Sequence, residues 1–241
     1  MIWLARLAFI LCAVFTVWTI VLVIQFGGEA PPPGAPMAEG FETPILALEF
    51  AGSESDLAFL AGDAGAPLRA ELQRVQALDV WFPIAYAGLA FWFFAGLFLC
   101  GRKLAAVGAI LALVTIFADW NENAVIDAML VMMNDGASGA ALLPELAVAT
   151  WIKWGLIAGY ALWFSILMGL EKRRILALPG LLPAGLILAA GLTGGSPMLI
   201  EMISLPLALL FLTILLTAMI YLRTSFKTEM GSHESARKIE T

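Results

Sequence analysis

The sequence predicts an all-α fold: a polytopic membrane helix bundle of about six transmembrane helices with a small exported helical cap. Three observations lead to this prediction. Hydrophobic residues make up 61% of the 241 residues and charged residues only 13%, whereas a soluble domain averages about a quarter charged. The apolar residues gather in six runs, each near the ~20 residues that a helix needs to cross a bilayer. Basic and acidic residues are sorted to opposite sides of these runs.

The six runs cover residues 2–26, 79–100, 104–120, 146–170, 175–192 and 198–222. Residues 1–26 form the first transmembrane helix. We interpret it as an uncleaved signal anchor, because its apolar stretch is longer than that of a signal peptide and no Ala-x-Ala-like cleavage site follows it. Residues 79–222 form a five-helix transmembrane region.

Prolines and glycines predict where these helices bend or overrun the bilayer. Neither residue type interrupts 109–133, so the third helix should project beyond the membrane. Pro179, Pro183 and Pro206 predict kinks in the last two transmembrane helices.

Lysine and arginine are concentrated on one side of the predicted membrane. Ten of the thirteen lie there, and fifteen of the nineteen acidic residues lie on the opposite side. Because cytoplasmic loops carry the excess of basic residues, we expect a multi-pass protein of the bacterial cytoplasmic (inner) membrane with both termini in the cytoplasm. Residues 223–241 would then be a disordered cytoplasmic tail. The net charge of −6 argues against a nucleic-acid partner. The partner that we expect is the lipid bilayer.

Residues 27–78 form the only large exported segment, a Pro-rich spacer followed by short helices. The spacer spans 31–36, and residues 44–51 and 53–61 read as two short helices, with Ser53 as the N-cap of the second. Pro67 should begin a third helix that runs into the second transmembrane helix. The apolar residues of its short helices indicate that it lies on the membrane surface. The segment is too small to have a core of its own.

Ionisable residues recur at one predicted depth, near the exported ends of four transmembrane helices. Asp119, Glu122 and Asn123 share one helix face through their i, i+3, i+4 spacing. A short turn between the second and third helices brings Asp79 towards them. A charge near hydrocarbon costs about 2.5–3.5 kcal/mol at a helix centre, so these residues mark the place to look for function. The predicted polar cluster consists of Asp79, Tyr86, Asp119, Glu122, Asn123, Lys153 and Glu201.

Three interpretations of this cluster stay open. Its members are solvated groups within an interfacial tryptophan belt, a structural polar lock between helices, or a working site. The leading functional hypothesis is an inner-membrane protein that is not a conventional enzyme and whose cluster binds a cation, a lipid headgroup or a protein partner. One alternative is a membrane-embedded enzyme acting on an outer-leaflet lipid, with Asp119 or Glu122 as acid or base. The other is a small transporter or channel subunit in which Glu122 and Lys153 form a gated pair.

The residue types in the sequence limit which metal sites, cofactors and dimer contacts can be expected. The one histidine, His233, lies in the tail, which argues against a His-liganded zinc enzyme. A Ca²⁺ or Mg²⁺ site made by Asp79, Asp119 and Glu122 stays open. No phosphate loop or dinucleotide fingerprint occurs, so we expect no cofactor. Gly155 and Gly159 form a GxxxG pair, typical of close packing within the monomer or of a helix–helix dimer.

Three short segments carry a family resemblance: Leu48-Glu49-Phe50-Ala51 before a Ser/Asp-rich short helix, Asp79-Val-Trp-Phe-Pro-Ile-Ala-Tyr86, and Asp119-Trp-Asn-Glu-Asn123. Together they resemble a group of uncharacterised bacterial multi-pass membrane proteins with an Asp-x-x-Phe-Pro-x-x-Tyr segment and a later Asp-x-x-Glu-Asn segment. The likeness covers about residues 45–130. It brings no activity with it, and implies only that Asp79, Tyr86, Asp119, Glu122 and Asn123 act as a unit.

Overall fold

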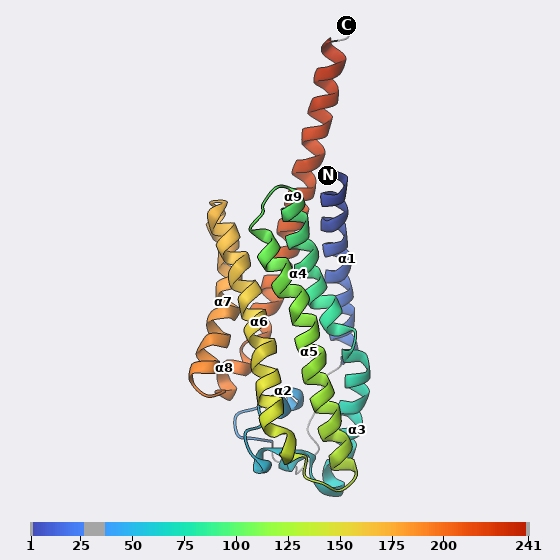
Figure 1. Cartoon of the computed structure of the whole chain (residues 1–241), viewed down its shortest axis with the longest axis vertical. Helices are drawn as coiled ribbons and strands as arrows, with labels where there is room; N and C mark the ends of the chain where they lie inside the picture. The colour runs from blue at the N-terminus through green and yellow to red at the C-terminus, as the bar shows by residue number, and fades with distance from the viewer. Residues whose placement is uncertain (1, 27–36, 240–241) are drawn as a thin grey trace.

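The computed structural model describes residues 2–26 and 37–239, with side chains through Thr224, and this part of the chain is all-helical, which confirms the predicted fold class (Figure 1). Six helices or helix pairs are long and apolar enough to cross a membrane. The protein is therefore a multi-pass membrane protein. The predicted Pro-rich spacer at 31–36 lies outside the described residues.

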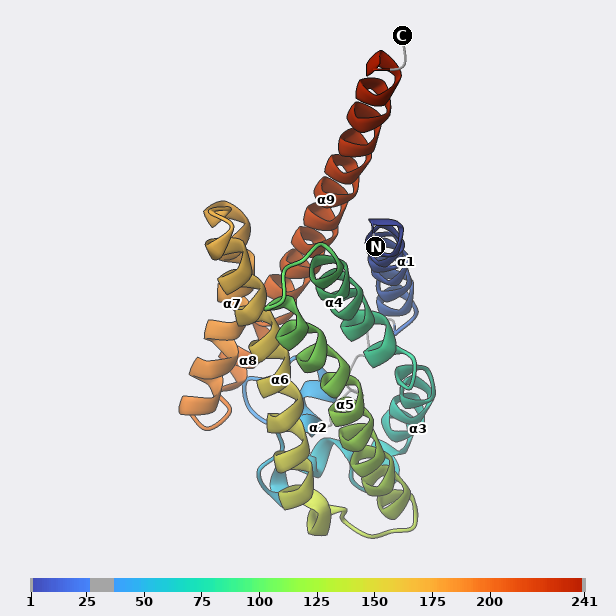
Figure 2. The same ribbon diagram turned by 45° about the horizontal axis from the view of Figure 1, so that its top comes forward.

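The six long helices form a ring. They are α1 (Ile2–Phe26), α4 (Phe82–Leu99), α5 (Ala105–Asn134), α6 (Leu143–Leu170), α7 (Arg174–Leu192) and α9 (Ser204–Ile239). Each packs against the next, and α9 returns to α1 (Figure 2). Fully buried aromatic side chains, among them Phe93, Phe94 and Phe164, fill the centre of the ring. The shorter elements are α2 (Pro44–Glu49), the 3₁₀ helices η1 (Glu54–Leu60) and η2 (Ala140–Leu142), α3 (Gly62–Asp79) and α8 (Pro197–Glu201).

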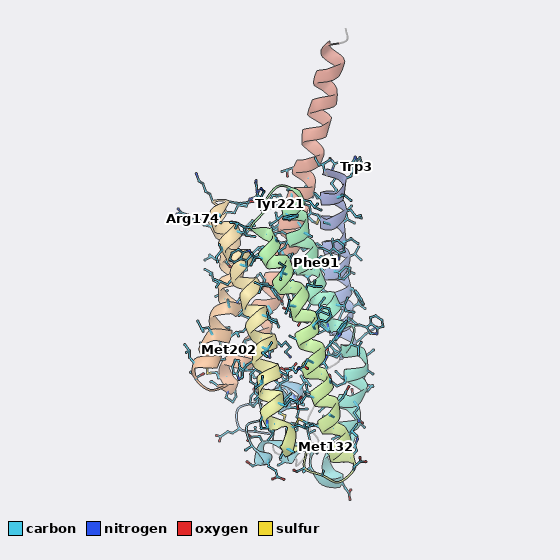
Figure 3. All side chains as sticks on the ribbon, in the orientation of Figure 1. Trp3, Phe91, Met132, Arg174, Met202 and Tyr221 are labelled. Atoms are coloured by element: carbon cyan, nitrogen blue, oxygen red, sulfur yellow. The ribbon has the colours of Figure 1, made fainter. Side chains whose placement is uncertain are left out.

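The two ends of the bundle differ in charge. We call the end that holds Arg102, Lys103 and Arg173 in its turns the basic end, and the end that holds α2, η1, α3 and the α5–α6 turn the acidic end. Helix α1 starts and α9 ends at the basic end, which is uppermost in Figure 1. Figure 3 shows Arg174 and Tyr221 near this end and Met132 near the opposite one.

Two prolines interrupt the crossings near the acidic end. A proline cannot donate a hydrogen bond to the carbonyl four residues earlier, and its ring clashes with that carbonyl. Pro83 therefore ends α3 at Asp79, and α4 restarts at Phe82. Pro206 acts in the same way on Met202, between α8 and α9. The crossing that was predicted to bend at Pro206 is thus interrupted directly before this residue, between α8 and α9, whereas Pro179 and Pro183 lie inside an unbroken α7.

The cap has no hydrophobic core of its own, as predicted, because its apolar side chains pack against the ends of the long helices α5 and α6. Helices α5 and α6, about 45 and 42 Å long at ~1.5 Å per residue, overrun a bilayer core of ~30 Å. Their projecting ends supply Ile126, Met129 and Leu146. These pack against Leu48 and Phe59 from α2 and η1. The short helices of the acidic end therefore share a core with the transmembrane helices.

Two predicted boundaries also differ from the structure. Helix α3 begins at Gly62, so Pro67 lies inside it and leaves only the carbonyl of Asp63, at the exposed first turn, without a helical donor. Helix α9 continues to Ile239, where the sequence predicted a disordered tail from residue 223. No proline follows Pro206 to end the helix, and good helix formers such as Lys, Glu, Met, Ala and Arg recur along that segment.

The GxxxG pair does not produce close packing within the monomer. A Cβ added to Gly155 would meet nothing within 4 Å, and one added to Gly159 would make ordinary contact with Leu111. The close approach between α6 and α7 lies instead at Gly180, where a Cβ would come within 2.3 Å of Ser165 Oγ. The dimer through Gly155 and Gly159 stays a prediction.

Candidate functional site

The exposed side chains of α5 mark where the apolar belt ends. Ile110, Leu113 and Phe117 are exposed on its outer surface, whereas past Trp120 the exposed residues include Asn121 and Asp127. A belt of exposed apolar side chains that ends at a tryptophan is typical of a membrane boundary. The predicted cluster begins at Asp119, so it lies at this boundary.

Lys153 is held between two carboxylates inside the bundle. Its Nζ lies 3.0 Å from Glu49 Oε1 and also forms an ion pair with Glu122 Oε2. All three residues are buried, Glu122 completely. The predicted pairing of Lys153 with Glu122 is present, and Lys153 does not extend outward to water. The interpretation of these groups as solvated interfacial charges is therefore wrong.

Glu49 is the member that the sequence analysis missed. Besides Lys153, it accepts a hydrogen bond from Trp154 Nε1 at 3.0 Å, and its backbone carbonyl accepts one from Thr150 Oγ1 at 3.2 Å. The short helix α2 is thus tied to α6 by one side chain and one carbonyl. A signal was present, because Glu49 is the only charged residue between 44 and 51, a pattern typical of a buried, paired carboxylate.

Asp119 anchors a second polar group beside the first. Its Oδ2 accepts a hydrogen bond from the Tyr86 hydroxyl at 2.7 Å, and its Oδ1 accepts one from Asn123 Nδ2 at 3.1 Å. The i, i+4 spacing of Asp119 and Asn123 on α5 makes the second contact possible. Tyr86 reaches Asp119 from α4. The structure therefore joins Tyr86, Asp119 and Asn123 as predicted from their positions.

A cavity of about 460 Å³ opens beside these groups, beneath α2 and α3. Its polar lining comes from Glu42, Thr43, Glu49, Gln76, Asp79, Tyr86, Asp119, Lys153 and Tyr160. Aromatic and aliphatic side chains complete the wall, among them Phe26, Phe82, Trp154, Ile157, Leu207 and Phe211. This volume is within the range of small-molecule sites, roughly 300–1,000 Å³.

Two buried polar atoms of the cavity wall have no partner among the described residues. They are the Tyr160 hydroxyl and Gln76 Nε2. A buried donor or acceptor without a partner costs about 1–3 kcal/mol, so such atoms are typical of a place where water or a ligand binds. Towards the basic end, the fully buried Phe93, Phe164 and Ile214 fill the core. The cavity thus belongs to the acidic half of the bundle.

Two residues of the predicted polar cluster, Asp79 and Glu201, lie outside the two hydrogen-bonded groups around Lys153 and Asp119. Asp79, at the end of α3, is half-buried and lines the cavity together with Asp119. Glu201 does not line it. Its Oε1 accepts hydrogen bonds from the backbone N–H groups of Glu42 and Thr43, at 3.0 and 2.9 Å, and so holds the start of α2.

The weak metal candidates do not form a coordination sphere. Within residues 2–26 and 37–224, no three His, Cys, Asp or Glu side chains are arranged to hold a metal ion. Glu122 faces Lys153, whereas Asp79 and Asp119 face the cavity.

Searches against protein-family models, curated proteins and solved structures found no match to this chain. The fold and the site define a multi-pass α-helical membrane protein with an amphipathic cavity at one end.

Proposed function

We propose that this chain is a binding protein of the bacterial inner membrane, with the acidic end exported, whose cavity takes a ligand that carries an amino or ammonium group. One observation carries the proposal: Asp79 and Asp119 face the cavity, while the cation that lines it, Lys153, is already matched by Glu49 and Glu122. Carboxylates near hydrocarbon are costly without a counter-charge. A cationic ligand supplies that charge.

The remaining wall suits an organic cation better than a bare metal ion. Phe82, Tyr86 and Phe211 form an aromatic group, with ring centroids 5.1 and 6.2 Å from Tyr86. Aromatic faces attract ammonium groups by about 0.5–2 kcal/mol. The unpartnered Tyr160 hydroxyl offers a further hydrogen bond. An ammonium group attached to an apolar part fits both halves of this wall.

The position of the basic residues supports the orientation. Arg102, Lys103 and Arg173 lie at the end opposite to the cavity, and the excess of lysine and arginine faces the cytoplasm in multi-pass proteins. The cavity would therefore open towards the exported face and collect its ligand from there or from the outer leaflet.

Calorimetry on the full chain in a neutral detergent tests the proposal. The probes are 2-phenylethylammonium and the matched neutral 2-phenylethanol. Because a hydrogen bond to a charged group contributes about 1.5–3 kcal/mol, we expect the ammonium to bind at least tenfold more tightly than the alcohol. Asp119→Asn should abolish this preference.

Asp127→Asn is the matched control, because Asp127 lies two turns further along α5 and is exposed. It should bind the ammonium like the natural chain. If Asp119→Asn fails to fold, Asp79→Asn replaces it, since Asp79 is only half-buried. Equal binding of the alcohol and the ammonium, or an equal loss in Asp127→Asn, would show that the carboxylates of the cavity do not select a cation.

A further inference from the structure

A second hollow, of about 730 Å³, lies at the basic end, between the α4–α5 turn and the end of α6. Helices α4 and α6 end in the same way. Gly101 and Lys172 adopt left-handed backbone conformations, with φ of 88° and 61°. The next residues, Arg102 and Arg173, donate backbone hydrogen bonds to carbonyls five residues earlier. These are Schellman motifs, and they place one arginine after each helix end.

The hollow carries a surplus of positive charge. Arg102, Lys103 and Arg173 line it, with Glu171 as the one acid of its lining. Arg102 Nε lies 2.7 Å from Glu171 Oε1, and Arg173 Nε lies 3.5 Å from Glu171 Oε2. The Glu171 carboxylate therefore lies between the two guanidinium groups and forms an ion pair with each. The hydroxyl of Tyr221, from α9, also donates to Glu171. Lys103 is exposed and forms no ion pair within the part of the chain that the structure describes.

The same hollow has an apolar wall that continues into the lipid-facing surface. Leu97 and Leu167 are buried in it, whereas Leu104 and Leu170 are exposed at its rim, by 54% and 64%. One turn into the membrane, α5 exposes Val107. A free anion would leave this apolar rim unused, but an amphiphile with an anionic head covers both parts.

We propose that this hollow binds the headgroup of an anionic phospholipid from the leaflet at the basic end. The phosphate lies against Arg102, Lys103 and Arg173, and an acyl chain lies along Leu104 and Leu170. Three cations against one acid match a phosphodiester, and basic pockets between transmembrane helices are a recurrent way of binding such headgroups. The proposal does not depend on the cavity at the acidic end.

Native mass spectrometry of the full chain in a neutral detergent tests it, with dioleoylphosphatidylglycerol and dioleoylphosphatidylcholine as probes. The acyl chains are the same, so the two lipids differ only in the headgroup, which is anionic in the first and zwitterionic in the second. We expect the phosphatidylglycerol to bind at least fivefold more tightly than the phosphatidylcholine. A surface charge contributes about 1 kcal/mol to such binding, so Lys103→Gln should weaken it about fivefold. Lys103 is exposed, so this variant should fold.

Arg174→Gln is the matched control. Arg174 is a basic residue at the same end, exposed at the start of α7, and it does not line the hollow (Figure 3). It should leave lipid binding unchanged. An equal loss in both variants, or equal binding of the two lipids, would overturn the proposal. Complete displacement of the lipid by equimolar inorganic phosphate would also overturn it, because the apolar wall would then contribute nothing.

Discussion

Replacing Lys153 with methionine tests the physical basis of the acidic-end site. Methionine approximates the unbranched stem of lysine, one atom shorter, and removes the cation that Glu49 and Glu122 share. Removing one partner of a buried ion pair costs about 3–5 kcal/mol, because the charge left behind has no compensation. Here two carboxylates are left behind.

The lower end of this range is the better expectation. Glu49 keeps its hydrogen bond from Trp154 in the variant, and one carboxylate can take up a proton. A loss of about 3 kcal/mol in the free energy of unfolding corresponds to a fall in Tm on the order of 10 °C for a chain of this size. The fall should be smaller at acidic pH, where protonation of one carboxylate removes the repulsion between Glu49 and Glu122.

Thermal unfolding of the purified chain in detergent, followed by circular dichroism, measures the effect. Lys103→Met makes the same chemical change at an exposed position, and should stay within about 0.5 kcal/mol of the natural chain. The double variant Lys153→Met/Glu122→Gln removes the second charge as well, so it should recover at least 1 kcal/mol of the loss. A Tm within 2 °C of the natural value for Lys153→Met alone would refute the reasoning.

Two further predictions concern packing and orientation. Gly180→Ala would place a Cβ 2.4 Å from the Ala161 carbonyl, so we expect a loss of about 1–3 kcal/mol in thermal unfolding. Gly185→Ala on the same helix meets nothing and should be neutral. Cys100 is exposed near the basic end and Cys12 is buried. Partial burial raises the pKa of the Cys100 thiol, so a membrane-impermeant maleimide should be used near pH 8. It should label Cys100 only after the cells are lysed, and labelling of intact cells would reverse the proposed orientation.

The helices of this fold could be predicted well because lipid imposes a simple rule on them. Each crossing needs about 20 apolar residues, and six such runs stand out in the sequence. The overrun of α5 was also readable, since no proline or glycine interrupts 109–133, and the helix continues to Asn134. The structure of the cap was harder to predict, because its hydrophobic core is shared with α5 and α6. No local pattern in 44–61 shows that Leu48 and Phe59 will meet Met129.

The site shows the same division between local and distant contacts. The pairing of Asp119 with Asn123 follows from helical spacing alone. That of Tyr86 with Asp119 needs only two adjacent antiparallel helices. Glu49 is 73 residues from Glu122 and 104 from Lys153, and no periodicity connects them. Leu48-Glu49-Phe50-Ala51 was part of the family resemblance, yet nothing in the sequence gave Glu49 a partner.

The cap and the site depend on each other through these distant contacts. Helix α2 covers the cavity, and it is also the element that brings Glu49 to Lys153. Lifting α2 would leave Lys153 with Glu122 as its remaining ion-pair partner and would break the hydrogen bonds from Trp154 to Glu49 and from Thr43 to Glu201. Each hydrogen bond to a charged group contributes about 1.5–3 kcal/mol. A closed cap is therefore part of the electrostatics of the cavity, because Glu49 reaches Lys153 only while α2 is in place.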